Sequence, residues 1–383
     1  MKTSADHILT THAGSLPRPR NLLARLTERQ AGIPYDPSEL QVAVNDIVRR
    51  QCELGIDVVT DGEMSKPNFL TYIDERLAGL ERETRSAGQD VANPWTETKD
   101  AATFPDYYSG GVGVPPLPLR MMCVGPLSYR GQMILQADIA NLKGAMKANG
   151  VDEAFMPSIS LSNVADFQVN KYYRSEEEHL FALADAMHEE YKAIIDAGLL
   201  LQVDDPNLVT HYMMGRDVTV EQTRKWAELR VDALNHALRD LPEDRIRFHT
   251  CYSINIGPRV FDMELKDIVD IMLRVRAGAY SFEYGNPRHE HEWRVWKNTK
   301  LRDDKILIPG VISNSTVVVE HPEVVADRIT RFADVVGRER VIAGADCGFS
   351  SSATFSPEVD AKVVWAKFEA LAEGARLASQ RLW

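Results

Sequence analysis

The sequence has few cysteines, no long apolar run and fewer basic than acidic residues. Four cysteines in 383 residues are too few and too scattered for a disulfide framework, so we expect reduced thiols. No apolar run reaches the length of about 18 residues that a membrane helix needs. The N-terminus also lacks the apolar core of a secretion signal. These absences predict a cytoplasmic protein that binds no membrane.

The charge balance limits the kind of partner. There are 44 Lys plus Arg against 56 Asp plus Glu, which gives a formal net charge of -12. This balance argues against a nucleic-acid groove or an anionic membrane as the main partner. We therefore expect a small molecule as the partner. The hydrophobic content of 44% supports a large core, and no long linker is apparent. The sequence predicts a single domain over residues 1–383.

A glycine-rich phosphate loop of the G-x-G-x-x-G type is also missing after the early strands, which argues against an open, doubly wound sheet. Short apolar runs instead alternate with longer segments of helical period, as in βα units around a parallel sheet. The candidate strands are residues 8–11, 57–60, 120–124, 154–159, 199–203, 246–251, 279–283, 305–311 and 340–345. A closed (β/α)8 TIM barrel needs eight strands, so one of these nine is supernumerary or lies outside the barrel.

Two amphipathic stretches, residues 176–198 and 220–241, carry apolar residues at three- and four-residue spacing and are predicted to be outer helices. The region of residues 81–118 departs from the alternation. It is polar, contains Pro, Gly and aromatic residues, and indicates a long insertion. Such a segment covers an active site, builds an oligomer contact or decorates the surface. We expect a homo-oligomer.

Polar side chains gather where several candidate strands end. They are Asp61, Glu63, Asp204, Asp205, His249, Cys251, Glu283, Asp346 and Cys347. A barrel brings the carboxyl ends of its strands together around one mouth, so residues that are distant in sequence become neighbours there. The number and spacing of the candidate strands and the polar residues at their ends therefore both favour a (β/α)8 barrel.

His249 and Cys251 are the most informative pair. Two residues apart on a strand, they point to the same side and can reach one metal ion. The alternative is a buried Cys beside a hydrogen-bonded His. Glu283 and Cys347 favour the metal site over this alternative. The four residues together offer one nitrogen, two sulfurs and one oxygen, a set that suits zinc. Glu283 on its own would be interpreted as a solvated or salt-bridged carboxylate.

Zinc with three strong ligands and one weaker carboxylate can admit an incoming thiol in place of the carboxylate. Coordination deprotonates the thiol while leaving it nucleophilic, which assists alkyl transfer to sulfur near neutral pH. The four residues therefore predict a zinc site that activates a small thiol as a zinc thiolate.

At these residues the sequence resembles the cobalamin-independent methionine synthases and their single-barrel relatives. A His-x-Cys pair, a Glu at the end of the next strand and a Cys in an Asp-Cys-Gly motif bind catalytic zinc in that family, and they match His249, Cys251, Glu283 and Cys347. The resemblance also implies substrate contacts. Gly14 and Ser15 would hold the amino-acid carboxylate, and Glu63 and Asp204 would hold the amino group of homocysteine. It covers nearly the whole chain but only the catalytic half of the long methionine synthases.

The chain is also similar to the epoxyalkane:coenzyme M transferases. It shares with them Ser281 to Glu283, Pro287 to His289 and His291 to Trp296. Those enzymes use the same zinc to make a thiolate that opens an epoxide. Since both reactions alkylate sulfur, the zinc residues do not separate them. A third hypothesis is a metal-free decarboxylase of the uroporphyrinogen type, which shares the barrel.

Two departures from the relatives concern the electrophile. Where both relatives place a His as a general acid, this chain has Asn314, which can donate a hydrogen bond but cannot release a proton. Acid catalysis then comes from His289, His291 or His321, or the electrophile needs no strong acid. We select Asn314 and His289 as the catalytic candidates. The second departure is a missing tryptophan near Gly125 that would contact a folate ring, which weakens the case for a methyl-folate donor.

The sequence thus predicts a zinc-dependent transferase in methionine biosynthesis that moves a methyl or similar alkyl group onto a small thiol. Homocysteine is the preferred acceptor, because Glu63 and Asp204 can pair with an ammonium. A methyl-folate is one candidate for the donor.

Overall fold

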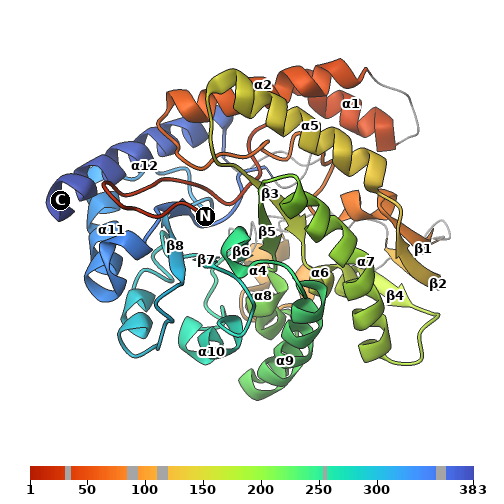
Figure 1. Cartoon of the computed structure of the whole chain (residues 1–383). Coiled ribbons are helices and arrows are strands. Elements are labelled where there is room, and N and C mark those ends of the chain that lie inside the picture. The colour runs from red at the N-terminus through yellow and green to blue at the C-terminus, as the bar shows by residue number, and fades with distance from the viewer. Residues whose placement is uncertain (31–35, 84–93, 110–119, 253–256, 351–358) are drawn as a thin grey trace.

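The later apolar runs of the chain form a curled parallel sheet. The computed structural model describes residues 1–30, 36–83, 94–109, 120–252, 257–350 and 359–383. Figure 1 shows the main sheet enclosed by helices. Its strand order is β3-β5-β6-β7-β8-β9. These strands are β3 (Phe155–Ile159), β5 (Leu200–Asp204), β6 (Ile246–Thr250), β7 (Ala279–Phe282), β8 (Ile306–Ile312) and β9 (Gly344–Ala345).

All neighbouring strands of this sheet run parallel, so their carboxyl ends lie along one edge. The register places Asp204 opposite His249, and His249 opposite Ser281. Side chains at paired positions of parallel strands point to the same face. The polar residues at the strand ends are therefore brought together, as the sequence predicts.

The first two predicted strands join the main sheet through single bridges. Thr10 pairs with Ala343, and Val59 pairs with Ala154, both in parallel. Between these two runs, the amide of Val58 donates a hydrogen bond of 3.0 Å to the carbonyl of Thr10. The α/β fold with a curled parallel sheet is thus confirmed. The closed eight-stranded barrel stays a prediction, because these two runs contribute bridges rather than assigned strands.

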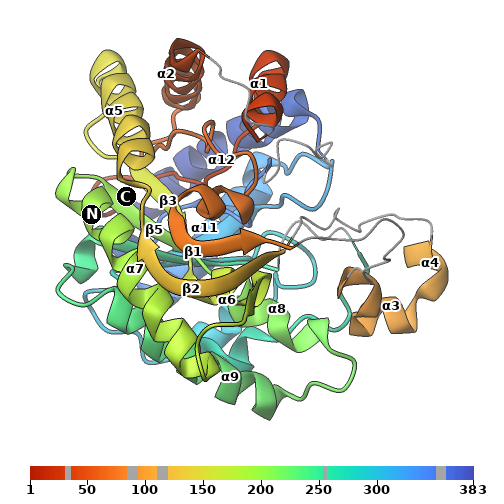
Figure 2. The same cartoon turned by 90° about the vertical axis from the view of Figure 1, so that its right-hand side faces the viewer.

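The third predicted strand, residues 120–124, belongs to a separate sheet of order β1-β2-β4. This sheet consists of β1 (Leu77–Arg82), β2 (Met121–Tyr129) and β4 (Gln168–Asn170), with β1 antiparallel and β4 parallel to β2. Figure 2 shows β1 and β2 side by side next to α7. Residues 120–124, predicted as one of the nine strands, therefore form the strand that lies outside the main sheet.

The helices of the described residues surround the main sheet or lie in its connections. The α-helices are α1 (Arg20–Gln30), α2 (Pro37–Glu53), α3 (Lys99–Thr103), α4 (Pro105–Ser109), α5 (Gln132–Asn149), α6 (Leu161–Phe167), α7 (Glu176–Asp196), α8 (Asn207–Met214), α9 (Val220–Ala237), α10 (Val269–Met272), α11 (Pro322–Val336) and α12 (Ala361–Leu382). The 3-10 helices are η1 (Thr71–Glu75), η2 (Pro94–Glu97), η3 (Glu243–Arg245), η4 (Leu265–Asp267), η5 (Glu292–Lys297) and η6 (Arg338–Arg340).

Both predicted outer helices are confirmed as α7 and α9, and local capping explains where they begin and end. The Ser175 side chain accepts a hydrogen bond from the third residue of α7, and Gly198 lies just past its end with a φ of 87°. Thr219 and Gln222 form a capping box at the start of α9. The helix α7 ends two residues earlier than predicted, and α9 ends four residues earlier. The apolar spacing continues beyond the last helical residue, so it does not reveal where the backbone leaves the helical conformation.

The predicted insertion is partly helical. Its described residues 94–109 contain η2, α3 and α4, which Figure 2 shows to one side of the main sheet. Lys99 Nζ donates a hydrogen bond of 2.8 Å to the carbonyl of Val218, and Asp100 Oδ1 accepts one of 3.2 Å from the amide of Val260. Residues 84–93 and 110–118 of the predicted insertion lie outside the described residues. The described part of the insertion thus contacts the segments that follow β5 and β6.

The main cluster of buried apolar side chains extends from Ile8 near the start of the chain to Ala378 near its end. It includes residues of the strands, such as Val203 and Phe248, and the buried faces of α11 and α12. Within the described part of the chain, no helix combines the length and the apolar character that crossing a membrane requires. The single domain predicted over residues 1–383 stays a prediction.

Candidate metal and substrate site

Three side chains at the carboxyl ends of two strands form a group that can bind a metal ion. His249 lies in β6, Cys251 follows this strand, and Cys347 follows β9. Their possible ligand atoms all lie within 4.8 Å of one another, and the two Sγ atoms are 2.9 Å apart. We call these three residues the metal-donor group. The fold thus brings together three of the four ligands that the sequence predicts.

The imidazole of His249 is buried and held by the neighbouring strand. Its Nδ1 lies 3.1 Å from the Oγ of Ser281, the residue opposite it in β7. Burial, together with the charge of Arg247, lowers the pKa of His249 to about 3. The ring is therefore neutral at physiological pH, which is the form of histidine that ligates metals.

Glu283, the fourth predicted ligand, comes directly after β7 and is not part of the metal-donor group. Its Oε1 accepts a hydrogen bond of 2.6 Å from the amide of Tyr252. Its Oε2 accepts one of 2.7 Å from Arg259 Nη2 and one of 2.9 Å from Asn286 Nδ2. Burial raises the pKa of Glu283 to about 7, although the charge of Arg259 opposes this rise. In this structure the carboxylate is thus bound by protein donors.

The chemistry of the metal-donor group fits zinc. One imidazole and two thiols are ligands that zinc prefers, and a site with three protein ligands keeps a position for substrate or solvent. The closeness of the two sulfur atoms, at 2.9 Å, also favours a cation beside them, because two neighbouring thiolates repel each other. The identity of the metal and the ligand role of each residue stay predictions.

Asp346, which directly precedes Cys347, fixes the loop that carries this cysteine. Its Oδ1 accepts hydrogen bonds of 2.8 Å and 2.6 Å from the amides of Tyr284 and Gly285. A side chain at Gly310 would collide with the same carboxylate. Asp346 therefore joins the Cys347 loop to the residues after β7 and to β8 itself. The sequence places it at a strand end but gives no sign of these partners.

A second set of residues, Glu63, Lys66 and Asp204, lies beside the metal-donor group, and we call it the acidic cluster. Asp204 is the register partner of His249. Lys66 Nζ lies 3.5 Å from Glu63 Oε1 and donates a hydrogen bond of 2.7 Å to the carbonyl of Pro157. All three side chains of the cluster are buried. The sequence predicts the two acids but not the lysine between them.

The charges within the acidic cluster influence one another. Burial alone would lower the pKa of Lys66, but the charge of Glu63, with further contributions from Asp61 and Asp204, raises it above its ordinary value. Burial and the charge of Glu63 raise the pKa of Asp204 well above its usual range. The cluster thus holds one firmly charged ammonium and a carboxyl group that gains from any further cation.

The predicted loop at Gly14 and Ser15 packs against both parts of the site. Gly14 has a φ of 136°, and a side chain there would come within 3.0 Å of Pro157 Cγ and 3.3 Å of Glu63 Oε1. The carbonyl of Ser15 accepts a hydrogen bond of 2.9 Å from the amide of Phe349, two residues after Cys347. Glycine is needed at position 14 both for its backbone conformation and for space. Contact of this loop with a substrate carboxylate stays a prediction.

His289, one of the two predicted catalytic residues, lies in a buried polar network. Its Nδ1 is 2.9 Å from Glu292 Oε2, and its Nε2 is 3.0 Å from Asp262 Oδ2. The ring also stacks on Tyr252, with centroids 4.1 Å apart. Burial opposes protonation, but the two carboxylates raise the pKa of His289 to about 9. Since both ring nitrogens have carboxylate partners, this geometry disfavours proton donation from His289 to a substrate.

Asn314, the other predicted catalytic residue, follows β8 and is buried. Its Oδ1 has no hydrogen-bond partner among the residues that the structure describes. A buried amide oxygen without a partner is costly and can accept a hydrogen bond from a bound molecule. The catalytic role of Asn314 stays a prediction.

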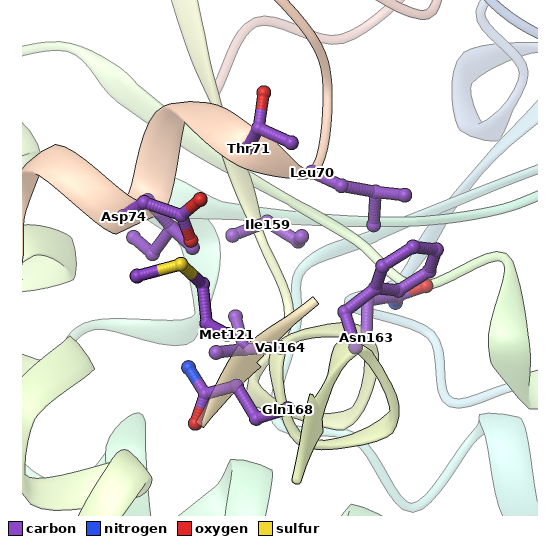
Figure 3. Close-up of a pocket in the computed structure, with 10 residues that line it drawn as sticks. Leu70, Thr71, Asp74, Met121, Ile159, Asn163, Val164 and Gln168 are labelled. Atoms are coloured by element: carbon purple, nitrogen blue, oxygen red, sulfur yellow. The ribbon is translucent and has the colours of Figure 1, made fainter. Parts of the chain in front are cut away.

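A small cavity lies beside the end of β3, away from the metal-donor group. Figure 3 shows the carboxylate of Asp74 and the side chain of Met121 on one side of it and Leu70 on the other. Its free volume of about 10 Å³ holds about one water molecule. Burial raises the pKa of Asp74 to about 7. This cavity is too small for a thiol or an alkyl donor, so we do not assign it to the substrate site.

Together, the curled parallel sheet and the donors at its strand ends define an α/β protein with a candidate metal site. A model of the family described as the cobalamin-independent synthase catalytic domain matches residues 166–363, just over half of the chain. The chain belongs to this family. The matched residues include the metal-donor group, Glu283 and Asp204.

Known relatives resemble the chain over most of its length. The methionine synthase of Saccharolobus solfataricus is 24% identical over 379 residues, which cover 97% of this chain and 95% of the relative. The methionine synthase of Thermococcus kodakarensis is 23% identical over 382 residues, which cover 97% and 94%. The predicted family is thereby confirmed.

Two solved structures share the fold. A B12-independent methionine synthase from Shewanella sp. W3-18-1, in complex with selenomethionine, has a TM-score of 0.72 at 19% identity, and the match covers 98% of this chain and 99% of that one. A putative vitamin-B12 independent methionine synthase from Listeria monocytogenes has a TM-score of 0.66 at 18% identity, with the same coverage of 98% and 99%. At these identities the two structures support the fold alone.

Proposed function

We propose that this protein is a zinc-dependent S-methyltransferase that methylates a small, homocysteine-like thiol and thereby forms methionine. The observation that carries the proposal is the metal-donor group, His249, Cys251 and Cys347, next to the acidic cluster at one edge of the sheet. The family match and the names of the relatives, which are methionine synthases, support methyl transfer as the reaction.

The metal-donor group would hold the zinc ion, with Glu283 as a weaker fourth ligand. Zinc, when bound, supplies a Lewis acid that keeps a thiol deprotonated and nucleophilic near neutral pH. Ser281 and Asp346 position His249 and Cys347 for this task. Such partners behind the ligands commonly decide how well a metal site works.

The acidic cluster and the Gly14–Ser15 loop would orient the acceptor. Glu63 and Asp204 would pair with its ammonium group, and Gly14 and Ser15 would contact its carboxylate. Fixing both groups places the sulfur of the acceptor near the metal-donor group, because Asp204 and His249 are register partners. We place this site at the mouth of a closed (β/α)8 barrel formed by one domain of residues 1–383, and we expect a homo-oligomer.

Asn314 would assist the donor side by accepting or donating a hydrogen bond, but an amide cannot release a proton. The donor is thus a methyl group on a carrier that leaves without strong acid assistance, or one that is protonated from solvent. A methyl-folate is one such candidate. The position of Asn314 after β8, at the same edge of the sheet as the metal-donor group, supports this assignment.

Opening of an epoxide by a zinc-bound thiolate would use the same donors, but the relatives named as methionine synthases favour methyl transfer. A metal-free decarboxylase would have no use for a group of three metal-binding side chains, of which His249 and Cys251 are buried.

The experiment that tests the proposal combines metal analysis with a substrate screen. The purified protein is expected to bind one zinc ion per chain. Homocysteine, coenzyme M and glutathione are each combined with methyl-folates, methylated sulfur or nitrogen compounds and small epoxides, and products are identified by mass spectrometry. Methionine from homocysteine is the expected product. A zinc-loaded protein that alkylates only coenzyme M with epoxides would contradict methyl transfer, and a protein that binds no zinc would contradict the metal site.

A further inference from the structure

A chain of buried charged groups leads away from Glu283. Arg259 Nη2 donates a hydrogen bond of 2.7 Å to Glu283 Oε2, and Arg259 Nε donates another of 2.7 Å to Asp262 Oδ2. The same oxygen of Asp262 lies 3.0 Å from His289 Nε2, and His289 Nδ1 lies 2.9 Å from Glu292 Oε2. The five side chains alternate in sign from Glu283 to Glu292 when His289 is protonated. We call them the charge chain.

The backbone around Arg259 is held in an unusual conformation. Arg259 has a φ of 59°, a region that residues other than glycine seldom occupy. The next residue, Val260, is held through its amide by Asp100 of α3 and through its carbonyl by Arg288, at 3.2 Å and 2.6 Å. The fold thus fixes the guanidinium of Arg259 against Glu283 from both sides of the loop.

Arg259 changes the charge that a metal-bound thiol would meet. Two cysteine thiolates balance the charge of a divalent zinc ion, and the guanidinium balances the Glu283 carboxylate. A free carboxylate beside the metal would compete with an incoming thiolate and repel it. To bind the metal, Glu283 would have to give up hydrogen bonds from Arg259, Asn286 and the amide of Tyr252. Charge-assisted hydrogen bonds such as the one from Arg259 are among the stronger ones in proteins.

We propose that Arg259 is a positioning residue that holds the Glu283 carboxylate out of the metal-donor group and so keeps a coordination position for the thiol. This inference rests on the proposed function, because it assigns Arg259 a role at the same zinc site. Asp262, His289 and Glu292 serve this role by fixing the guanidinium. The carboxylate would pair with Arg259 when a thiol is bound and would otherwise be available as a weak donor to the metal.

The test compares Arg259→Met with the parent protein in metal and thiol binding, without any methyl donor. Zinc affinity is measured by competition with a chelator, and thiol binding by the absorption of the cobalt-substituted protein as homocysteine is added. In Arg259→Met the released Glu283 becomes a permanent fourth ligand. We expect zinc to bind about tenfold more tightly and homocysteine about tenfold more weakly, a scale typical for partners of metal ligands. Arg259→Lys, which keeps the charge, should lie between the two.

The direction of the change in zinc affinity shows whether Arg259 holds Glu283 away from the metal or supports it as a ligand. If Arg259 instead supports Glu283 as a permanent ligand, Arg259→Met binds zinc more weakly, and that result overturns the proposal. Unchanged zinc and thiol binding also overturns it. The control is Arg274→Met, which removes an exposed guanidinium that pairs with Glu228 and Asp232 rather than with the Arg259 loop. Its zinc and thiol affinities should equal those of the parent.

A second variant serves if Arg259→Met does not fold. Glu283→Gln leaves Arg259 in place and removes the carboxylate charge. We expect it to bind homocysteine at least as tightly as the parent and to lose less than tenfold in zinc affinity. A loss of zinc as severe as in a cysteine variant would show that Glu283 is a permanent ligand and would overturn the proposal. Parent protein that binds zinc and thiol but forms no methionine would contradict the proposed function and leave the role of Arg259 intact.

Discussion

The metal-donor group and the acidic cluster meet at one edge of the sheet but differ in charge balance. The metal-donor group consists of a neutral imidazole and two thiols, and it contains no cation of its own. The acidic cluster already contains a cation, because Lys66 lies between Glu63 and the neighbouring carboxylates. The first group is thus incomplete without a metal ion, whereas the second is close to balanced without any ligand.

This difference separates two properties of the proposed enzyme. Loss of one member of the metal-donor group should remove the metal and with it the activation of any thiol, because two strong ligands and one weak carboxylate hold zinc poorly. A change in the acidic cluster alters only how an acceptor with an ammonium compares with one without it. The metal-donor group should therefore determine whether the reaction occurs, and the acidic cluster should determine which thiol is used.

The largest effect is expected from Cys347→Ala. With His249, Cys251 and only the weaker donor Glu283 left, the variant should lose its zinc. Its kcat/KM should fall roughly a thousandfold or more for every thiol, since the Lewis acid contributes several kcal/mol. Zinc content and turnover with homocysteine are measured together. Cys52→Ala is the control, because Cys52 is half-buried in α2, outside the metal-donor group. Full zinc content in Cys347→Ala would refute its role as a ligand.

The metal-donor group could be predicted from the sequence because its signals are local. His249, Cys251 and Cys347 each follow or end a short apolar run, and parallel strands place such ends on one edge. The acidic residues Glu63 and Asp204 carry the same signal. Lys66 does not, since a lysine three residues after a glutamate is indistinguishable in sequence from an ordinary surface lysine.

The parts that could not be predicted depend on contacts between distant segments. Arg259 lies in a loop, and its partner Glu283 is known only once β6 and β7 are paired. His289 looked available for proton transfer, but the fold surrounds it with Asp262 and Glu292. The strand at residues 121–129 has the same apolar pattern as the strands of the main sheet, so its place in a second sheet was not evident from periodicity.

The next effect, in size, should come from Asp204→Asn. The carboxylate is expected to pair with the ammonium of homocysteine, and hydrogen bonds to charged groups contribute about 1.5 to 3 kcal/mol. The KM for homocysteine should rise roughly tenfold to a hundredfold. The KM for 4-mercaptobutyrate, which lacks the ammonium, should hardly change. Zinc content should equal that of the parent. An equal rise for both thiols would mean that Asp204 acts on the metal site rather than on the ammonium.

Lys66→Met should have a smaller effect of opposite sign. Removing the resident ammonium leaves Glu63 and Asp204 in need of a cation, so homocysteine should bind about fivefold more tightly, which corresponds to about 1 kcal/mol of relieved repulsion. Binding of 4-mercaptobutyrate should not improve. Lys66→Arg keeps the charge and serves as the control. Weaker binding of homocysteine would instead mean that Lys66 orients Glu63 or contacts the substrate carboxylate.

Asn314→His should have the smallest effect, and it concerns the donor rather than either part of the acceptor site. The imidazole could protonate a leaving group, which the amide cannot do. Burial at this position would, however, lower the pKa of the new histidine and limit the protonated fraction at neutral pH. We therefore expect kcat to rise only about threefold, with most of the gain below pH 7, measured as a pH profile with homocysteine and the preferred donor. Unchanged kcat at every pH would show that the proton comes from elsewhere, so that Asn314 acts through a hydrogen bond alone.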